Sequence, residues 1–368
     1  MKISSAIFRI LLLLFILLCS SVSCLSRKQG STVTAMFVFG SSLVDNGNNN
    51  YVRNSTARAD YLPYGIDFPC GPSGRFSNGN NPVDVLGRLL NLPHLLPVFS
   101  DPKTRGKRIL RGVNYASGGS GILDETGSIS GEVITLKQQI DNFEGATLPE
   151  LKAQLGRFKR AGPFISKSLF VVGAGGNDYL LNYFQSNTSA QYSLPDFTSL
   201  LIQSLSEKLK RLYDLGARKF VLMSVQALGC VPAVTMRVNT DGSCVEPVNL
   251  AALLFNQRLV SSMDKMKASM KGSHLVFVNS YNILKEIIEH PTLHGFKEVN
   301  KPCCALGESS ARILCERGGE TCKERDAYVF YDGLHPTDAV NVRIAQKAYA
   351  SWLKREVYPF NVQHLASL

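Results

Sequence analysis

Short apolar runs alternate with longer amphipathic stretches along most of this chain, and this alternation is the feature that most constrains its fold. The runs are rich in β-branched and aromatic residues, which is typical of strands buried on both faces of a sheet. We expect strands at 36–39, 111–115, 168–172, 219–224 and 274–279. Apolar positions three and four residues apart predict helices at 83–90, 133–143, 148–164, 196–215, 248–271, 281–289 and 337–355. Strands that alternate with helices predict a three-layer α/β/α sandwich around a mostly parallel five-stranded sheet.

The N-terminal stretch differs from the rest of the chain. Lys2 and Arg9 flank its start, residues 10–18 are unbroken hydrocarbon, and small residues follow. This is the pattern of a secretory signal peptide, and the apolar run is too short for a comfortable membrane span. We expect a signal peptide over 1–24 and a secreted protein with no stable membrane insertion. Because no Pro/Ser/Gly linker divides the remainder, we expect a single domain over 25–368.

Secretion determines how the nine cysteines are interpreted. Cys19 and Cys24 lie in the predicted signal peptide, so seven remain in an oxidising compartment, where cysteines mostly pair. Their spacing fits no standard zinc pattern, and no histidine lies close to them in sequence. Cys70 is the isolated candidate for a free thiol, unless Cys24 survives cleavage and makes the count even. We therefore expect disulfides, and no metal site, among Cys230, Cys244, Cys303, Cys304, Cys315 and Cys322.

The chain is basic, with a formal net charge of +11, or +9 once Lys2 and Arg9 are removed. This charge suits electrostatic association with acidic polysaccharide or an anionic surface. The basic residues are scattered, and the densest run, 103–111, is typical of a solvated loop. With secretion, this argues against nucleic acid as a partner. Asn54 and Asn187 each begin an N-glycosylation triplet in a polar, loop-like segment.

Small and polar residues follow the first three predicted strands, at 40–42, 114–121 and 173–178. In open α/β sheets, ligands bind at the carboxyl ends of the strands. Glycine there lets backbone N–H groups approach a ligand closely. One Gly-Ser-Ser turn is usually only a turn, but the recurrence of such loops on one edge indicates a site.

A fourth polar segment, Asp332 to Thr337, leads into the last predicted helix, whose first turn suits Pro336. An Asp three residues before a His can orient the imidazole ring. Most such pairs are capping or surface arrangements, but this loop is tightly constrained by glycine and proline. His335 is one of only six histidines in the chain.

Taken in order, these four segments resemble the four sequence blocks of the GDSL (SGNH) hydrolases. The likeness extends through 44–50, 74–79, 229–232, Cys303-Cys304 and 335–337. It is the pattern of the plant secreted GDSL esterase/lipase family, and it spans nearly all of the mature chain. The resemblance implies a flavodoxin-like SGNH fold and a secreted carboxylic ester hydrolase that needs no metal or organic cofactor.

The resemblance also implies roles for individual residues. Ser42 would be the nucleophile, and His335 would take its proton and later pass it to the leaving alcohol. Asp332 would hold the His335 tautomer and stabilise the imidazolium.

Three donors would hold the oxyanion of the tetrahedral intermediate: the Ser42 backbone N–H, a backbone N–H of the second block and the Asn177 side-chain amide. Gly121 is the expected second-block donor, with Gly119 as the alternative. One residue departs from the family motif, which has Asp where this chain has Ser41. We expect this change to alter the rate or the pH profile and not to abolish activity.

The implied substrates are esters of lipids, other acyl esters or acetylated wall polysaccharides, in the cell wall or apoplast. Two other functions fit the same residues. The protein would be an extracellular acyltransferase if an alcohol replaced water as the acceptor. It would be a weakened scaffold that binds glycan or lipid if Ser41 marked the loss of catalysis. A secreted serine protease fits poorly, because the block order matches no protease pattern.

Overall fold

The central sheet has six strands in the order β2-β1-β3-β4-β5-β8. The computed structural model describes residues 33–238, 240–308 and 313–368, so the predicted signal peptide lies outside the described residues. Five strands are parallel, and they match the five predicted runs. They are β1 (Met36–Gly40), β2 (Gly112–Asn114), β3 (Leu169–Gly173), β4 (Lys219–Met223) and β5 (His274–Val278).

Two features of the sheets were not predicted. The sixth strand, β8 (Val357–Tyr358), pairs antiparallel with β5, so the prediction of five strands is one short. A separate parallel pair is formed by β6 (Glu298–Pro302) and β7 (Tyr328–Phe330). These strands are two to five residues long and carry no alternating pattern, which explains why periodicity missed them.

Eleven described helices surround the sheet. They are α2 (Pro82–Leu89), α3 (Leu136–Asn142), α4 (Leu148–Gln154), α5 (Arg157–Ser166), α6 (Thr188–Gln191), α7 (Leu194–Asp214), α8 (Pro232–Val238), α9 (Glu246–Ser269), α10 (Ser280–Glu289), α11 (Asp338–Ala350) and α12 (Val362–Ser367). The helix expected over 148–164 is two helices, because Gly156 adopts φ 70° between α4 and α5. The last expected helix, 337–355, ends at Ala350. Thr337 is its N-cap, so Pro336 precedes the helix and does not lie in its first turn.

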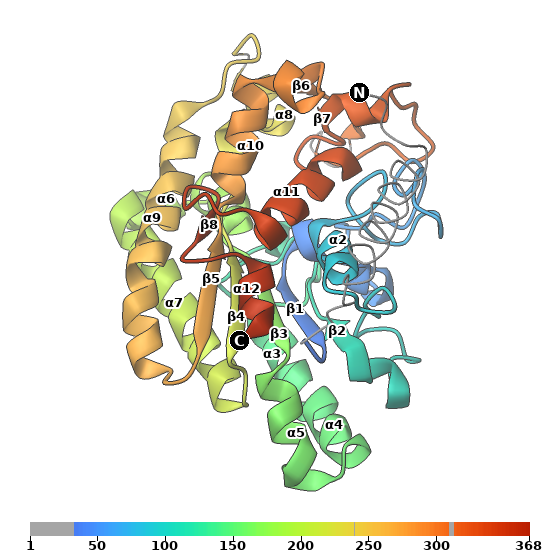
Figure 1. Ribbon diagram of the computed structural model, residues 1–368. Coiled ribbons are helices and arrows are strands. Elements are labelled where there is room, and N and C mark those ends of the chain that lie inside the picture. Colours follow the sequence, from blue (N-terminus) through green and yellow to red (C-terminus); the bar gives the residue numbers. More distant parts are fainter. Residues whose placement is uncertain (1–32, 239, 309–312) are drawn as a thin grey trace, which may run out of the picture. The chain divides into compact units, whose positions relative to one another are not determined.

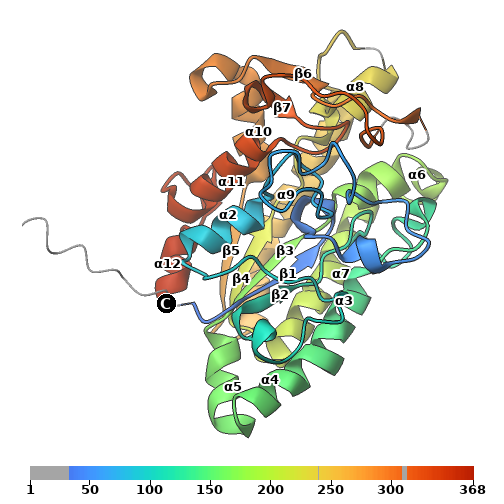
Figure 2. The same ribbon diagram turned by 90° about the vertical axis from the view of Figure 1, so that its right-hand side faces the viewer.

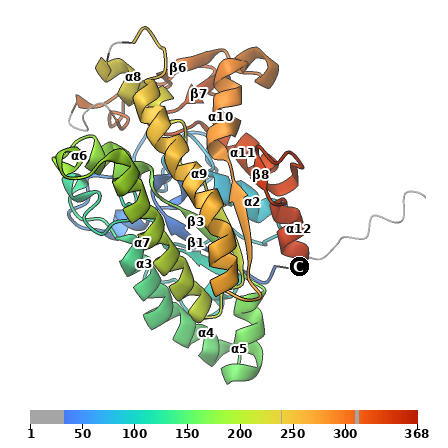
Figure 3. The same cartoon turned by 90° about the vertical axis from the view of Figure 1, so that its left-hand side faces the viewer.

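The helices form one layer on each face of the sheet, as predicted. Helices α3, α7 and α9 cover one face (Figure 3). Helices α2, α11 and α12 cover the other, with α2 packed along α11 (Figure 2). Both faces of the strands are buried, which is the arrangement that near-continuous apolar strands require. Figure 1 shows the sheet between these two layers, with the α4–α5 pair at one end.

An aromatic cluster fills the space between β1 and the α3 layer. Phe37 lies edge-on to Phe143 at 5.1 Å between ring centroids, and Phe39 stacks on Tyr115 at 4.9 Å. All four rings are buried. Aromatic pairs at these distances add to the burial energy. The cluster therefore fixes β1, whose carboxyl end carries the Gly-Ser-Ser turn.

The three predicted strand-end loops follow β2, β1 and β3, which are neighbours in the sheet. They consequently meet at one edge, as the sequence indicated. Within the described ranges, no helix combines the length and hydropathy that crossing a bilayer would need.

Candidate active site

The turn after β1 is possible only because residue 40 is glycine. Gly40 has φ 140°, and a Cβ there would lie 2.1 Å from the carbonyl oxygen of Gly173 at the end of β3. The next residue extends the pairing, with the Ser41 N–H donating to that same carbonyl at 3.0 Å. A short 3₁₀ turn then begins at Ser42, whose residue is 8% exposed. The chain thus places the Ser42 hydroxyl at the sheet edge.

Ser42 meets the loop before α11. Its Oγ lies 2.7 Å from Nε2 of His335, and Nδ1 of that ring lies 2.8 Å from Oδ2 of Asp332. Asp332 is fully buried. Its Oδ1 accepts the backbone N–H groups of Leu334 and His335 at 2.8 and 2.6 Å, so the loop's own amides fix the carboxylate. The structure therefore brings the three predicted triad residues into one hydrogen-bonded series.

Two residues to which the sequence analysis gave no role support this series. The hydroxyl of Tyr64 donates to Oδ2 of Asp332 at 2.6 Å and accepts the N–H of Cys315 at 3.1 Å. Burial and the nearby Asp332 charge raise the pKa of Tyr64, so it remains a donor. The ring of Phe76 packs on the His335 imidazole, 4.8 Å between centroids. Tyr64 is separated from Asp332 by 268 residues, and no local pattern in the sequence marks this contact.

Gln139 of α3 braces the turn from the other side. Its Oε1 accepts the Gly40 N–H at 2.8 Å, and its Nε2 donates to the carbonyls of Gly40 and Ile134, each at 2.9 Å. The Ser120 hydroxyl donates to the same Gly40 carbonyl at 2.8 Å. A buried amide with both ends satisfied is well suited to hold a backbone in one conformation.

The third loop supplies Asn177, just after Gly175 and Gly176 at the end of β3. The Asn177 side chain is buried beside Ser42, and its Nδ2 donates to the Ser120 carbonyl at 2.9 Å. One amide hydrogen engaged in this way orients the group and leaves the other for a ligand. The predicted oxyanion donor therefore lies in the Ser42 cavity.

Asp178, the next residue, ties the third loop to the second. Its carboxylate accepts the backbone N–H groups of Ile122 and Leu123 and the Thr126 hydroxyl, at 2.7 to 3.0 Å. Burial raises the pKa of Asp178 to about 6, against the lowering effect of these hydrogen bonds.

Comparison with known proteins matches this geometry to a family. The family model for GDSL-like lipases/acylhydrolases matches residues 36–348. This chain belongs to that GDSL family. It is 41% identical to the GDSL esterase/lipase At1g29660 of Arabidopsis thaliana over 345 residues, which cover 93% of each chain. It is 43% identical to the GDSL esterase/lipase At5g08460 of the same plant, over 93% of this chain and 90% of the relative.

The GDSL motif residue that is replaced here, Ser41, forms few side-chain interactions. Its Oγ is 3.4 Å from the Gly173 carbonyl, a long hydrogen bond. A carboxylate four residues later, Asp45, joins the first two GDSL blocks instead. Asp45 accepts the N–H groups of Gly47, Asn48 and Gly118 at 2.7 to 3.0 Å, and burial raises its pKa to about 6. The turn is therefore fixed without an acid at position 41.

The oxyanion donor expected from the second GDSL block stays a prediction. Neither Gly119 nor Gly121 is among the described residues that line the Ser42 cavity. Gly121 packs against Asp178, since a Cβ there would lie 2.6 Å from the carboxylate oxygens. Its peptide is nevertheless held in place, because the Ser120 carbonyl of that peptide accepts Asn177.

The cavity at Ser42 is small, about 60 Å³. Besides Ser42, His335 and Asn177, the residues that line it include Leu180 and Leu334, together with Ser224 and Gln226 from the segment after β4. Within the described part of the chain, the buried Nε2 of Gln226 has no hydrogen-bond partner. An unpaired buried donor of this kind is costly in free energy.

The cysteines form disulfides, as predicted. The pairs are Cys230–Cys244, Cys303–Cys322 and Cys304–Cys315, and Cys70 is free and exposed. The first pair encloses α8, and the other two lie beside Tyr64, so they brace the surroundings of the GDSL site. The predicted glycosylation residues Asn54 and Asn187 are both exposed.

Proposed function

We propose that this protein is a secreted serine ester hydrolase that cleaves carboxylic esters through an acyl-Ser42 intermediate. The observation that carries the proposal is the series Ser42 Oγ, His335 Nε2, His335 Nδ1 and Asp332 Oδ2, with contacts of 2.7 and 2.8 Å. A hydroxyl, an imidazole and a buried carboxylate in this order are the parts of an activated serine nucleophile.

In the first half of the proposed reaction, Nε2 of His335 takes the proton of Ser42 as Oγ attacks the ester carbonyl carbon. Asp332 keeps the Nδ1 proton on the far side of the ring and stabilises the imidazolium. Because Tyr64 and two backbone amides already hold this carboxylate, it need not reorient during the step. The imidazolium then protonates the alcohol oxygen as the C–O bond breaks.

Preorganised hydrogen-bond donors stabilise the negative charge that develops on the carbonyl oxygen. We assign these to the Ser42 N–H, the Asn177 amide and the Gly121 N–H. Loss of one such donor typically costs about 3–4 kcal/mol in the transition state. In the second half, water attacks the acyl-serine by the same route, and the acid is released.

The cellular setting is part of the proposal. The predicted signal peptide over 1–24, the single domain over 25–368, the three disulfides and the exposed Asn54 and Asn187 all suit an extracellular protein of the cell wall or apoplast. The relatives are named esterase/lipases, so we propose small or lipid esters, or esters on wall polysaccharides, as substrates. The net charge of +9 that remains without Lys2 and Arg9 suits contact with acidic polysaccharide.

The test is hydrolysis of p-nitrophenyl acetate and butyrate by the purified secreted protein. Ser42→Ala should abolish turnover, whereas Ser41→Ala, a matched loss of the adjacent hydroxyl, should keep most of it. Unchanged turnover in Ser42→Ala would show that the triad assignment is wrong. An inert wild type that Ser41→Asp activates would favour the binding-scaffold alternative. Added glycerol, with product analysis, separates hydrolysis from acyl transfer.

A further inference from the structure

A second, apolar pocket continues from the catalytic cavity. It has a volume of about 190 Å³, and two of its lining residues, Leu180 and Leu334, also line the cavity at Ser42. Leu334 immediately precedes His335, and Leu180 follows Asn177 by three residues on the same helical turn. The two hollows therefore meet beside the reacting groups.

The far walls of this pocket are hydrocarbon. Phe184, Val234 and Val248 line it, from the segment after β3, from α8 and from the start of α9. Its described lining contains no carboxylate, and its polar members, Gln185 and Arg237, are both exposed. An apolar pocket with polar groups only near its mouth fits a hydrocarbon chain.

The pocket is held in a fixed relation to the catalytic loop. The Ala233 N–H at the start of α8 donates to the carbonyl of Gly333, between Asp332 and His335, at 2.7 Å. The Cys230–Cys244 disulfide closes the segment that contains α8. The wall that carries Val234 is thus tied to the loop of Asp332 and His335 and lies within the segment that the disulfide closes.

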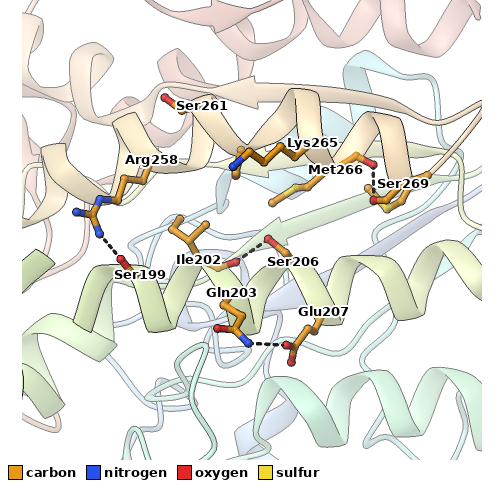
Figure 4. Close-up of a pocket in the computed structure, with 12 residues that line it drawn as sticks. Ser199, Ile202, Gln203, Ser206, Glu207, Arg258, Ser261, Lys265, Met266 and Ser269 are labelled. Carbon is orange, nitrogen blue, oxygen red and sulfur yellow. Dashed lines mark hydrogen bonds between the residues drawn. The ribbon is translucent and has the colours of Figure 1, made fainter. Parts of the chain in front are cut away.

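The larger groove elsewhere on the molecule does not compete for this role. It runs between α7 and α9, and Figure 4 shows it bordered by Ser199, Arg258 and Lys265. It shares no lining residue with the Ser42 cavity. Of these two hollows, the smaller, apolar pocket is therefore the one that a chain attached to the carbonyl at Ser42 can enter.

We propose that the pocket bounded by Leu180, Phe184, Val234, Val248 and Leu334 binds the acyl chain of the ester and selects medium-length chains. This inference rests on the proposed esterase function. We assign the pocket to the acyl chain of the ester and not to the alcohol. The carbonyl oxygen would be bound at Asn177, and Leu180, which lines the pocket, follows Asn177 by three residues. The polar side of the cavity, with Ser224 and Gln226, is left for the alcohol.

The volume sets the expected chain length. A water molecule occupies about 30 Å³ in the liquid, and a methylene group is of similar size. The pocket then holds roughly six methylene groups, so hexanoyl and octanoyl esters should be preferred. Each buried methylene should raise kcat/KM by about fourfold until the pocket is full.

The test compares kcat/KM for p-nitrophenyl acetate, hexanoate, octanoate and laurate. Val234→Phe fills the pocket and should lower octanoate turnover at least tenfold while acetate turnover stays within twofold. Met236→Phe is the matched control, since Met236 lies on the same helix, is 49% exposed and is not a lining residue; it should leave the profile unchanged. Phe184→Ala, at an exposed position, should lower the octanoate-to-acetate ratio severalfold without affecting folding.

Several outcomes would overturn the assignment. Equal loss on acetate and octanoate in Val234→Phe, or no chain-length effect in either pocket variant, would contradict it. So would a Val234→Phe defect on octyl acetate in place of p-nitrophenyl octanoate, because the pocket would then hold the alcohol. Failure of the esterase proposal is distinct, since it appears as acetate turnover that survives Ser42→Ala.

Discussion

Gln139 is the residue whose replacement best tests how the nucleophile turn is held. Gln139→Leu introduces an apolar side chain of similar size and removes both the donor and the acceptor of the amide. The Gly40 N–H and the Ile134 carbonyl then have no side-chain partner, whereas the Gly40 carbonyl still accepts the N–H of Ser117 and the hydroxyl of Ser120.

The magnitude follows mainly from the Gly40 N–H, which is buried, because the Ile134 carbonyl is only part-buried. Leaving one buried group unsatisfied costs about 1–3 kcal/mol, so the free energy of unfolding should fall by about 1–3 kcal/mol. A typical domain has a total stability of about 5–15 kcal/mol. Because Gly40 sets the position of Ser42, we also expect kcat to fall about 100-fold, the usual effect of misplacing a reacting group by about 1 Å.

The assay is urea denaturation followed by circular dichroism, with kcat for p-nitrophenyl butyrate measured on the same samples at a temperature where the variant is folded. Gln138→Leu is the matched control. Gln138 caps α3 through the Thr135 N–H and is exposed, so its loss should cost about 1 kcal/mol and leave kcat unchanged. If Gln139→Leu loses less than about 1 kcal/mol and keeps its kcat, the bracing argument is wrong.

Three further predictions concern the same region. Tyr64→Phe removes a donor to a buried carboxylate and leaves the Cys315 N–H without a partner, so the free energy of unfolding should fall by about 2–4 kcal/mol and kcat should drop. Thermal denaturation and turnover at 25 °C measure these two effects. An unchanged kcat would argue against a positioning role. Gln226→Met removes an unpaired buried donor and should raise the free energy of unfolding by about 1 kcal/mol, and a lower denaturation midpoint would contradict this. Asp45 and Asp178 bind a proton more tightly in the folded protein, with pKa values of about 6 against 3.8. Their contribution to stability is therefore full below pH 4 and is lost as the pH rises through 6, by about 3 kcal/mol each; a denaturation midpoint that rises between pH 4 and 6.5 would refute it.

The sequence predicted the parallel core of the fold well, because each strand there is a short apolar run that needs burial on both faces. It failed where elements are held by context. Strand β8 has two residues and exists only because β5 lies beside it. The break between α4 and α5 occurs at Gly156, and a prediction from the spacing of apolar residues takes no account of glycine.

The candidate site shows the same division. Ser42, Asp332, His335 and Asn177 were predicted from local motifs and from the family resemblance, and the structure places them together. Gln139 and Tyr64 hold that arrangement, yet each acts through contacts with residues far away along the chain. Neither lies in a motif, since a buried Gln in a helix or a Tyr in a loop has many other uses. Such supporting residues become visible only when the fold brings them to their partners.

The distance along the chain between the nucleophile and its base has a consequence for biosynthesis. Ser42 and His335 are 293 residues apart, at the two ends of the domain. A ribosome that has completed about four-fifths of this chain has therefore made Ser42, its turn and the five parallel strands, but neither β8 nor His335. By the proposed mechanism, a chain that ends before His335 cannot cleave esters. Ester turnover would then show that the chain is complete and that its two ends have folded together.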